Sequence, residues 1–156
     1  MNERIWIYTL SRELTNEQLV DIKNRCQNFV DNWTAHEVSL DATFSIEYNR
    51  FLIIKVNEQK YNASGCSIDK QLRFIKDLEA LFGIELLNRM LVAYLDADSN
   101  VQVIKQSQVA ELVKTNHITE NTLVFDNTIS TGNQLQTEWK KALKDTYLAK
   151  YLSISA

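Results

Sequence analysis

Proline is absent from this 156-residue chain, and glycine occurs only three times. Flexible linkers and disordered segments are usually rich in one or both residues. Their scarcity favours one domain that spans residues 1–156, a length sufficient to bury about two thirds of the unfolded surface.

Cysteine and histidine are also scarce, with two residues of each. Cys26 and Cys66 lie far apart, and no Cys/His set has the spacing of a zinc site. We therefore expect no structural disulfide, no metal and no cofactor.

Long apolar runs and an excess of one charge are missing as well. No segment approaches the ~18 apolar residues of a membrane span, and residues 1–4 lead into a short strand without a signal-peptide core. The net charge is −3, with acidic and basic residues interspersed. This pattern disfavours nucleic acid and membranes as partners, and we expect a cytoplasmic protein.

Regular apolar patterns are what the sequence does contain. Period-two or continuous apolar runs predict strands at residues 4–10, 41–48, 51–56 and 90–95, and helical periodicity follows Thr15 and Ser67. The expected buried stripes are Leu19, Ile22, Cys26, Phe29, Val30 and Trp33, then Ile68, Leu72, Ile75, Leu78 and Phe82. Residues 1–95 thus give the βαββαβ order of a ferredoxin-like (split βαβ) core, with its first and third strands central.

A C-terminal αβα extension over residues 96–156 completes the expected α+β fold. Its elements are a helix at 109–115, a strand at 122–125 and a last helix that begins at Thr131, which with Gln134 forms a capping box. The stripe expected along that last helix is Leu135, Trp139, Leu143, Tyr147 and Tyr151. We expect the extension to pack on the second face of the sheet or to extend one of its edges.

The polar segment 62–70 joins a strand to a helix and permits three interpretations. Ser64 or Ser67 caps the helix, with Gly65 allowing the turn. Alternatively, the free amides at the helix start bind a small anion or a phosphate-bearing ligand. The ligand-binding residues would then be Ser64, Gly65, Cys66, Ser67 and Lys70.

The third interpretation makes Cys66 a nucleophile whose pKa is lowered by the helix terminus. A thiol enzyme also needs a base within reach. In a split βαβ unit the loop holding His36 lies at the same end as Cys66, so His36 is the candidate base. A loop histidine that bonds to backbone is the simpler interpretation of His36.

Two other patterns are weaker. The run Asp96-x-Asp98-x-Asn100 resembles the start of a calcium loop, but it lacks the glycine and glutamate of such a loop, and a hairpin turn explains it. The strand at 51–56 lacks the glycine and exposed aromatic residues of an RNA-binding sheet.

Several segments carry a resemblance to a known group: residues 33–36, 48–51, 64–70 and 125–127, with Trp139 and residues 144–147. Together they resemble short, uncharacterised bacterial proteins that genome annotation often labels "ABC transporter ATPase". That label implies an ATPase. However, none of the three glycines begins the Gly-x-x-x-x-Gly-Lys-Ser/Thr loop that surrounds the phosphates of ATP, so the sequence does not support ABC-type ATPase activity.

The sequence therefore predicts a non-enzymatic binding or interaction module, with a small anionic ligand or another protein as its partner. The alternative is a thiol-dependent hydrolase or transferase that uses Cys66 with His36. A third possibility is a purely structural subunit, which a stable oligomer and the lack of any ligand effect on the melting temperature would favour.

Overall fold

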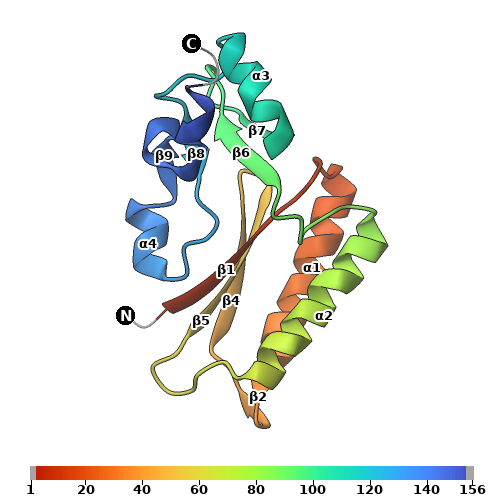
Figure 1. The fold of residues 1–156 in the computed structure, drawn as a ribbon. Helices are drawn as coiled ribbons and strands as arrows, with labels where there is room; N and C mark the ends of the chain where they lie inside the picture. The colour runs from red at the N-terminus through yellow and green to blue at the C-terminus, as the bar shows by residue number, and fades with distance from the viewer. Residues whose placement is uncertain (1–2, 154–156) are drawn as a thin grey trace.

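The computed structural model describes residues 3–153, which form a mixed α+β protein built on antiparallel sheets (Figure 1). Its strands are β1 (Glu3–Thr9), β2 (Thr34–Ala35), β3 (Val38–Ser39), β4 (Ala42–Glu47), β5 (Phe51–Asn57), β6 (Leu91–Leu95), β7 (Val101–Lys105), β8 (Leu123–Phe125) and β9 (Lys140–Ala142). Its α-helices are α1 (Asn16–Asn32), α2 (Gly65–Phe82), α3 (Val109–Lys114) and α4 (Gly132–Thr137). Short 3₁₀ helices are η1 (Gln106–Gln108), η2 (Leu143–Asp145) and η3 (Tyr147–Tyr151).

The first sheet has the order β1-β5-β4, with every neighbouring pair antiparallel. Strand β5 lies in the middle, and its residues Phe51 to Ile54 are fully buried, because they are covered on both faces. Helices α1 and α2 cover one face, where Ile22, Cys26, Ile75 and Leu78 join a single apolar cluster with β4 and β5 (Figure 1).

Each long helix has a cap that the sequence predicted. Thr15 and Gln18 form the reciprocal hydrogen bonds of a capping box at α1. Helix α2 ends at Gly83, whose φ of 60° and ψ of 44° give the predicted left-handed C-cap.

The complete ferredoxin-like arrangement is not confirmed, because β6 does not join the first sheet. Strand β6 pairs with β7 and β8 instead of with β1. The edge of β1 beside which β6 was expected is occupied by the backbone of residues 130 and 131: the Ile5 amide donates to Ser130 O at 2.9 Å, and Arg4 forms a bridge with Thr131. Strand β1 is therefore an outer strand of its sheet.

The second sheet has the order β7-β6-β8-β9 and lies on the other side of the first sheet from the two long helices (Figure 1). A shared apolar cluster holds the two sheets together. It combines Ile5, Phe51 and Ile53 of the first sheet with Phe125 and Trp139 of the C-terminal part.

The prediction of one long C-terminal helix is wrong beyond Thr137. Helix α4 starts at the predicted Thr131 cap but has only six residues, and strand β9 and the 3₁₀ helices follow it. The sheet bonds of β8 compete with helix propagation here: the Asp126 amide donates to Trp139 O at 2.7 Å, and the Leu143 amide donates to Thr122 O at 2.8 Å. The regular apolar spacing from Leu135 to Tyr151 therefore serves several short elements.

No helix within residues 3–153 is long and apolar enough to cross a membrane.

Candidate functional site

The start of α2 is closed by two serines that cap each other. Ser64 Oγ accepts from the Ser67 amide at 3.2 Å, and Ser67 Oγ accepts from the Ser64 amide at 2.7 Å. The Ser67 hydroxyl also donates to Ser64 O at 2.8 Å. The capping interpretation thus accounts for both hydroxyl groups, and the helix begins two residues earlier than the predicted Ser67.

The amides of Gly65 and Cys66 are the groups that remain for a ligand at this helix start. Neither has an acceptor within the described part of the chain. The carboxylate of Glu58 is bound two residues before Gly65, where its Oε2 accepts from the Ala63 amide at 2.8 Å. This negative charge near the helix start opposes the binding of an additional anion.

The buried stripe of α2 differs from the prediction in its first turns. Leu72 is 38% exposed, whereas Ser67 and Gln71 are each only 1% exposed. The backbone carbonyl of Ser67 accepts from the Trp33 indole at 2.8 Å, and Gln71 Oε1 accepts from the Tyr8 hydroxyl, whereas Gln71 Nε2 has no partner among the described residues. Burial raises the pKa of Tyr8, so its hydroxyl stays protonated and can donate.

The hairpin of β2 and β3 lies against the same end of α2. Lys70 Nζ donates to Thr34 Oγ1 at 3.3 Å, next to the bond between Trp33 and Ser67. His36 lies at the tip of this hairpin, exposed and with a positive φ of 50°. Among residues 3–153, His36 and Cys66 form no hydrogen bond with each other, so the structure holds no assembled thiol–imidazole pair.

The two cysteines have opposite environments. Cys66 is exposed at the second position of α2, whereas Cys26 is fully buried on α1, as predicted. Burial raises the pKa of the Cys26 thiol to about 12. Of the two thiols, only that of Cys66 can reach a reagent or substrate.

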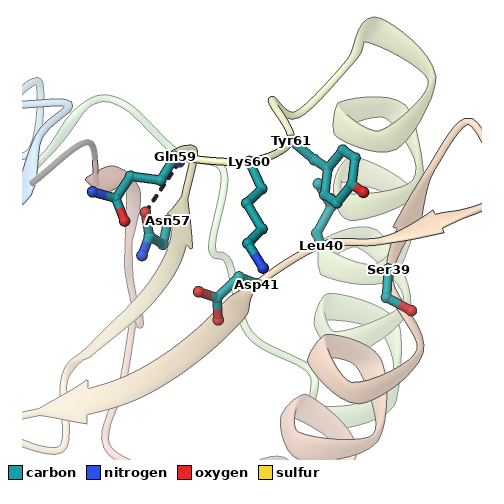
Figure 2. Close-up of a pocket in the computed structure, with 7 residues that line it drawn as sticks. All are labelled: Ser39, Leu40, Asp41, Asn57, Gln59, Lys60 and Tyr61. Carbon is teal, nitrogen blue, oxygen red and sulfur yellow. Dashed lines mark hydrogen bonds between the residues drawn. The ribbon is translucent and has the colours of Figure 1, made fainter.

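A hollow of about 270 Å³ lies beside the hairpin, and Figure 2 shows the residues that line it. Its walls come from the connection between β3 and β4, the end of β5 and the loop after it. The lining residues are Ser39, Leu40, Asp41, Asn57, Gln59, Lys60 and Tyr61. Figure 2 shows Lys60 extending toward Asp41, while the Tyr61 ring lies near Leu40.

Side-chain hydrogen bonds hold this loop in place. Asn57 Oδ1 accepts from the Gln59 amide at 3.1 Å, which closes a turn at the end of β5. The bond from the Ala63 amide to Glu58 spans the loop that carries Lys60 and Tyr61. The hollow is thus formed by a braced loop that continues directly into the capped start of α2.

The sequence reasoning missed the residues of this hollow. Its one available signal was the polar run from Asn57 to Tyr61, which places amides, a cation and an aromatic ring directly after a buried strand. The side chains from residues 39–41 gave no signal, because only the pairing of β4 with β5 brings them to the same place.

A larger hollow of about 470 Å³ lies between α1 and α2. The rings of Phe29 and Phe74 stack in parallel there, with centroids 4.3 Å apart, and Leu81 is 56% exposed. Its walls are side chains of two helix surfaces, and the side-chain hydrogen bonds of Arg25 and Asn28 stay within α1, to Asp21 and Asn32.

The Asp96 segment forms the predicted hairpin turn. One carboxylate oxygen of Asp96 accepts from the amides of Asp98 and Asn100, both at 2.9 Å. Within residues 3–153, no group of three or more His, Cys, Asp or Glu side chains is arranged to hold a metal ion.

Comparisons with known protein families, with characterised proteins and with solved structures find no match to this chain.

Proposed function

We propose that the protein is a non-enzymatic binding module whose site is the end of the molecule formed by the hollow and the start of α2. The observation that carries this proposal is the hollow itself, with several polar side chains and one aromatic ring gathered on a braced loop. At about 270 Å³ the hollow lies just below the roughly 300 Å³ at which typical ligand pockets begin, and its lining residues are mostly polar, so it suits only a small polar molecule.

The chemistry of the walls defines the ligand class. Lys60 supplies a positive charge in the hollow. The amides of Gly65 and Cys66 at the start of α2 are further donors, although the Glu58 carboxylate lies near them. Asn57 and Gln59 offer side-chain amides, and Tyr61 offers a ring face. A small polar molecule with one carboxylate or phosphate group fits these donors, with its acidic group near Lys60. Asp41 disfavours a ligand that carries negative charge throughout.

Thermal unfolding in the presence of inorganic phosphate and of small carboxylates tests this proposal. At least one probe should raise the melting temperature of the wild-type protein, and Lys60→Met should remove most of that rise. Lys76→Met is the matched control, because Lys76 is exposed on α2 outside the hollow, and it should behave as wild type. The proposal fails if no probe shifts the wild-type transition, or if Lys60→Met retains the full shift.

The alternative function, a thiol-dependent hydrolase or transferase, is favoured by the exposure of Cys66 at a helix start. His36 would act as the base after a movement of the β2–β3 hairpin. Cys66→Ser separates the two functions. It should leave ligand-induced stabilisation intact in a binding module, whereas it should abolish turnover in a thiol enzyme.

The two free cysteines favour a reducing compartment, and we propose the cytoplasm as the location.

A further inference from the structure

Strand β4 is, like β1, an outer strand of the first sheet, and one of its edges has no partner within residues 3–153. The amide of Asn57 donates to Asp41 O at 2.9 Å, which fixes the alternation of the antiparallel ladder. Asp41, Thr43, Ser45 and Glu47 therefore direct their backbone groups toward β5. The backbone groups of Ala42, Phe44 and Ile46 face outward, where only another extended backbone can satisfy them in a regular ladder.

This edge has little of the usual protection against pairing, since Glu47 is its one charged residue. The six residues of β4 include no lysine, arginine, proline or glycine. The outer strands of the second sheet differ, since β9 has only three residues and begins with Lys140 and Lys141, and β7 ends in Lys105. Short length and lysine are common ways to block an edge, so β4 is the least protected of the three.

One side chain on β4 also lacks a partner. Ser45 Oγ is buried and forms no hydrogen bond within the described residues. A buried hydroxyl without a partner costs free energy, so nearly all such groups are satisfied in native proteins. Thr43 and Glu47 lie on the same face of the strand, one pleat to either side of Ser45.

We propose that β4 pairs with β4 of a second copy of this chain to form an antiparallel dimer with Ser45 on its two-fold axis. In this register Ser45 lies opposite Ser45 of the other copy, and a rotation of each side chain about its Cα–Cβ bond brings the two buried hydroxyl groups together. Phe44 and Ile46 exchange backbone hydrogen bonds across the interface. Each Thr43 hydroxyl lies opposite the carboxylate of Glu47 in the other copy. The two three-stranded sheets become one sheet of six strands.

This register has two neighbours, with the axis at Ile46 or at Phe44. The turn after β4 disfavours the first, because Phe44 would face Tyr48, whose φ is 55°, and side-chain charge disfavours the second. A shift that moves the axis to Phe44 would place Glu47 opposite Asp41 of the other copy, and like charges directly opposite each other are destabilising. The pairing of Thr43 with Glu47 instead joins a donor to an acceptor. The pairing of Thr43 with Glu47 favours a second copy of the same strand as the partner, because an unrelated peptide would not supply these two side chains in register.

Sedimentation equilibrium with charge variants at Thr43 tests the dimer. Thr43→Glu places a second carboxylate opposite Glu47 twice per dimer, and should raise the dimer dissociation constant about 2- to 10-fold. Thr43→Lys places an ammonium group there and should leave the dimer as tight as wild type or tighter. Gln136→Glu on α4 is the control, because Gln136 is exposed and lies outside β4, and it should have no effect. A wild-type protein that is monomeric at every concentration, or a variant series in which lysine dissociates the dimer and glutamate does not, overturns the proposal.

Disulfide trapping tests the register and does not depend on the charge variants. In a Cys66→Ser background, Ser45→Cys should form a covalent dimer under mild oxidation. Directly opposite residues of this kind have Cα atoms about 4.5 Å apart, which lies within the range of a disulfide. Thr43→Cys is the matched control: it is more exposed than Ser45 but should not cross-link, because it faces Glu47. Equal cross-linking of both variants, or cross-linking of Thr43→Cys alone, contradicts the proposed pairing.

Discussion

At the scale of single residues, buried polar groups connect segments that lie far apart in the sequence. The Trp33 indole reaches Ser67 O at the start of α2, and the Trp139 indole donates to Asn127 Oδ1 at 2.8 Å. Asn127 in turn donates to Thr9 Oγ1 at the end of β1. Each bond fixes one place where two elements meet. Because only a partner at the right distance satisfies such a buried group, these bonds make the packing specific.

The contrast between the two cysteines gives a prediction at this scale. Native protein should react with one equivalent of iodoacetamide, at Cys66, while Cys26 reacts only after unfolding. The cause is burial, which keeps Cys26 out of reach and raises its thiol pKa to about 12. Mass spectrometry of the labelled peptides gives the measurement.

The pH profile of this labelling also bears on the alternative function. An ordinary thiol profile for Cys66, with a midpoint near pH ~8.5, would leave no role for thiolate activation. A midpoint well below that value would favour the thiol enzyme. Labelling of Cys26 in the native state would contradict the described packing of α1.

At the scale of elements, an ion pair links the end of β8 to β9 in the second sheet. Lys141 Nζ lies 3.0 Å from Asp126 Oδ2, and both side chains are partly exposed. Burial acts to raise the pKa of Asp126, but hydrogen bonds from Thr128 and Lys141 outweigh it, so this pKa is lowered overall. The same carboxylate raises the pKa of Lys141.

The lowered pKa of Asp126 makes its contribution to stability depend on pH. A carboxyl group with a depressed pKa in the folded state stabilises the protein above its unfolded pKa of about 3.9, and this stabilisation is lost as the pH falls through the folded value. Asp126→Asn should therefore lower the free energy of unfolding by about 1 kcal/mol at pH 7. Urea unfolding at several pH values should show this difference shrinking below pH ~4. A difference that stays constant from pH 7 to pH 3 would mean that the charge of Asp126 has no part in it.

The elements also show which predictions the sequence supports. Thr15, Thr131 and Gly83 mark helix ends correctly, because a cap is decided by a few neighbouring residues. The predicted helix does not continue after Thr137, because helical spacing of apolar side chains also suits short elements that pack on one core. Neither the edge that β6 joins nor the hollow could be predicted, since both depend on contacts between distant segments.

At the scale of the whole molecule, one aromatic cluster joins the two sheets. Trp139 lies 5.1 Å from Phe51 of the first sheet and 4.9 Å from Phe125 of the second, measured between ring centroids. Tyr48 covers this cluster from the turn between β4 and β5, and Lys140 donates to its hydroxyl at 3.0 Å. Because the sheets share these rings, we expect them to unfold together.

Removal of Trp139 tests this coupling. Trp139→Ala should lower the free energy of unfolding by about 3–5 kcal/mol, since the side chain is buried and leaves a large cavity. Tyr147→Ala is the control: Tyr147 is 61% exposed, so its removal should change stability by about 0.5 kcal/mol or less. Urea unfolding followed by circular dichroism gives both values. Two separate transitions in the wild-type protein would contradict the expected coupling.

The binding site is also a property of the whole molecule, because it combines the turn before β4, the loop after β5 and the start of α2. An NMR titration of ¹⁵N-labelled protein with inorganic phosphate and a set of small carboxylates observes all three segments at once. For at least one probe, binding at the proposed site should shift the amide signals of Gln59, Lys60, Tyr61, Gly65 and Cys66 in a saturable way, and Lys60→Met should weaken the effect. The proposal would be contradicted if no probe shifted these signals, or if the saturable shifts appeared instead around Phe29 and Phe74 between the two long helices.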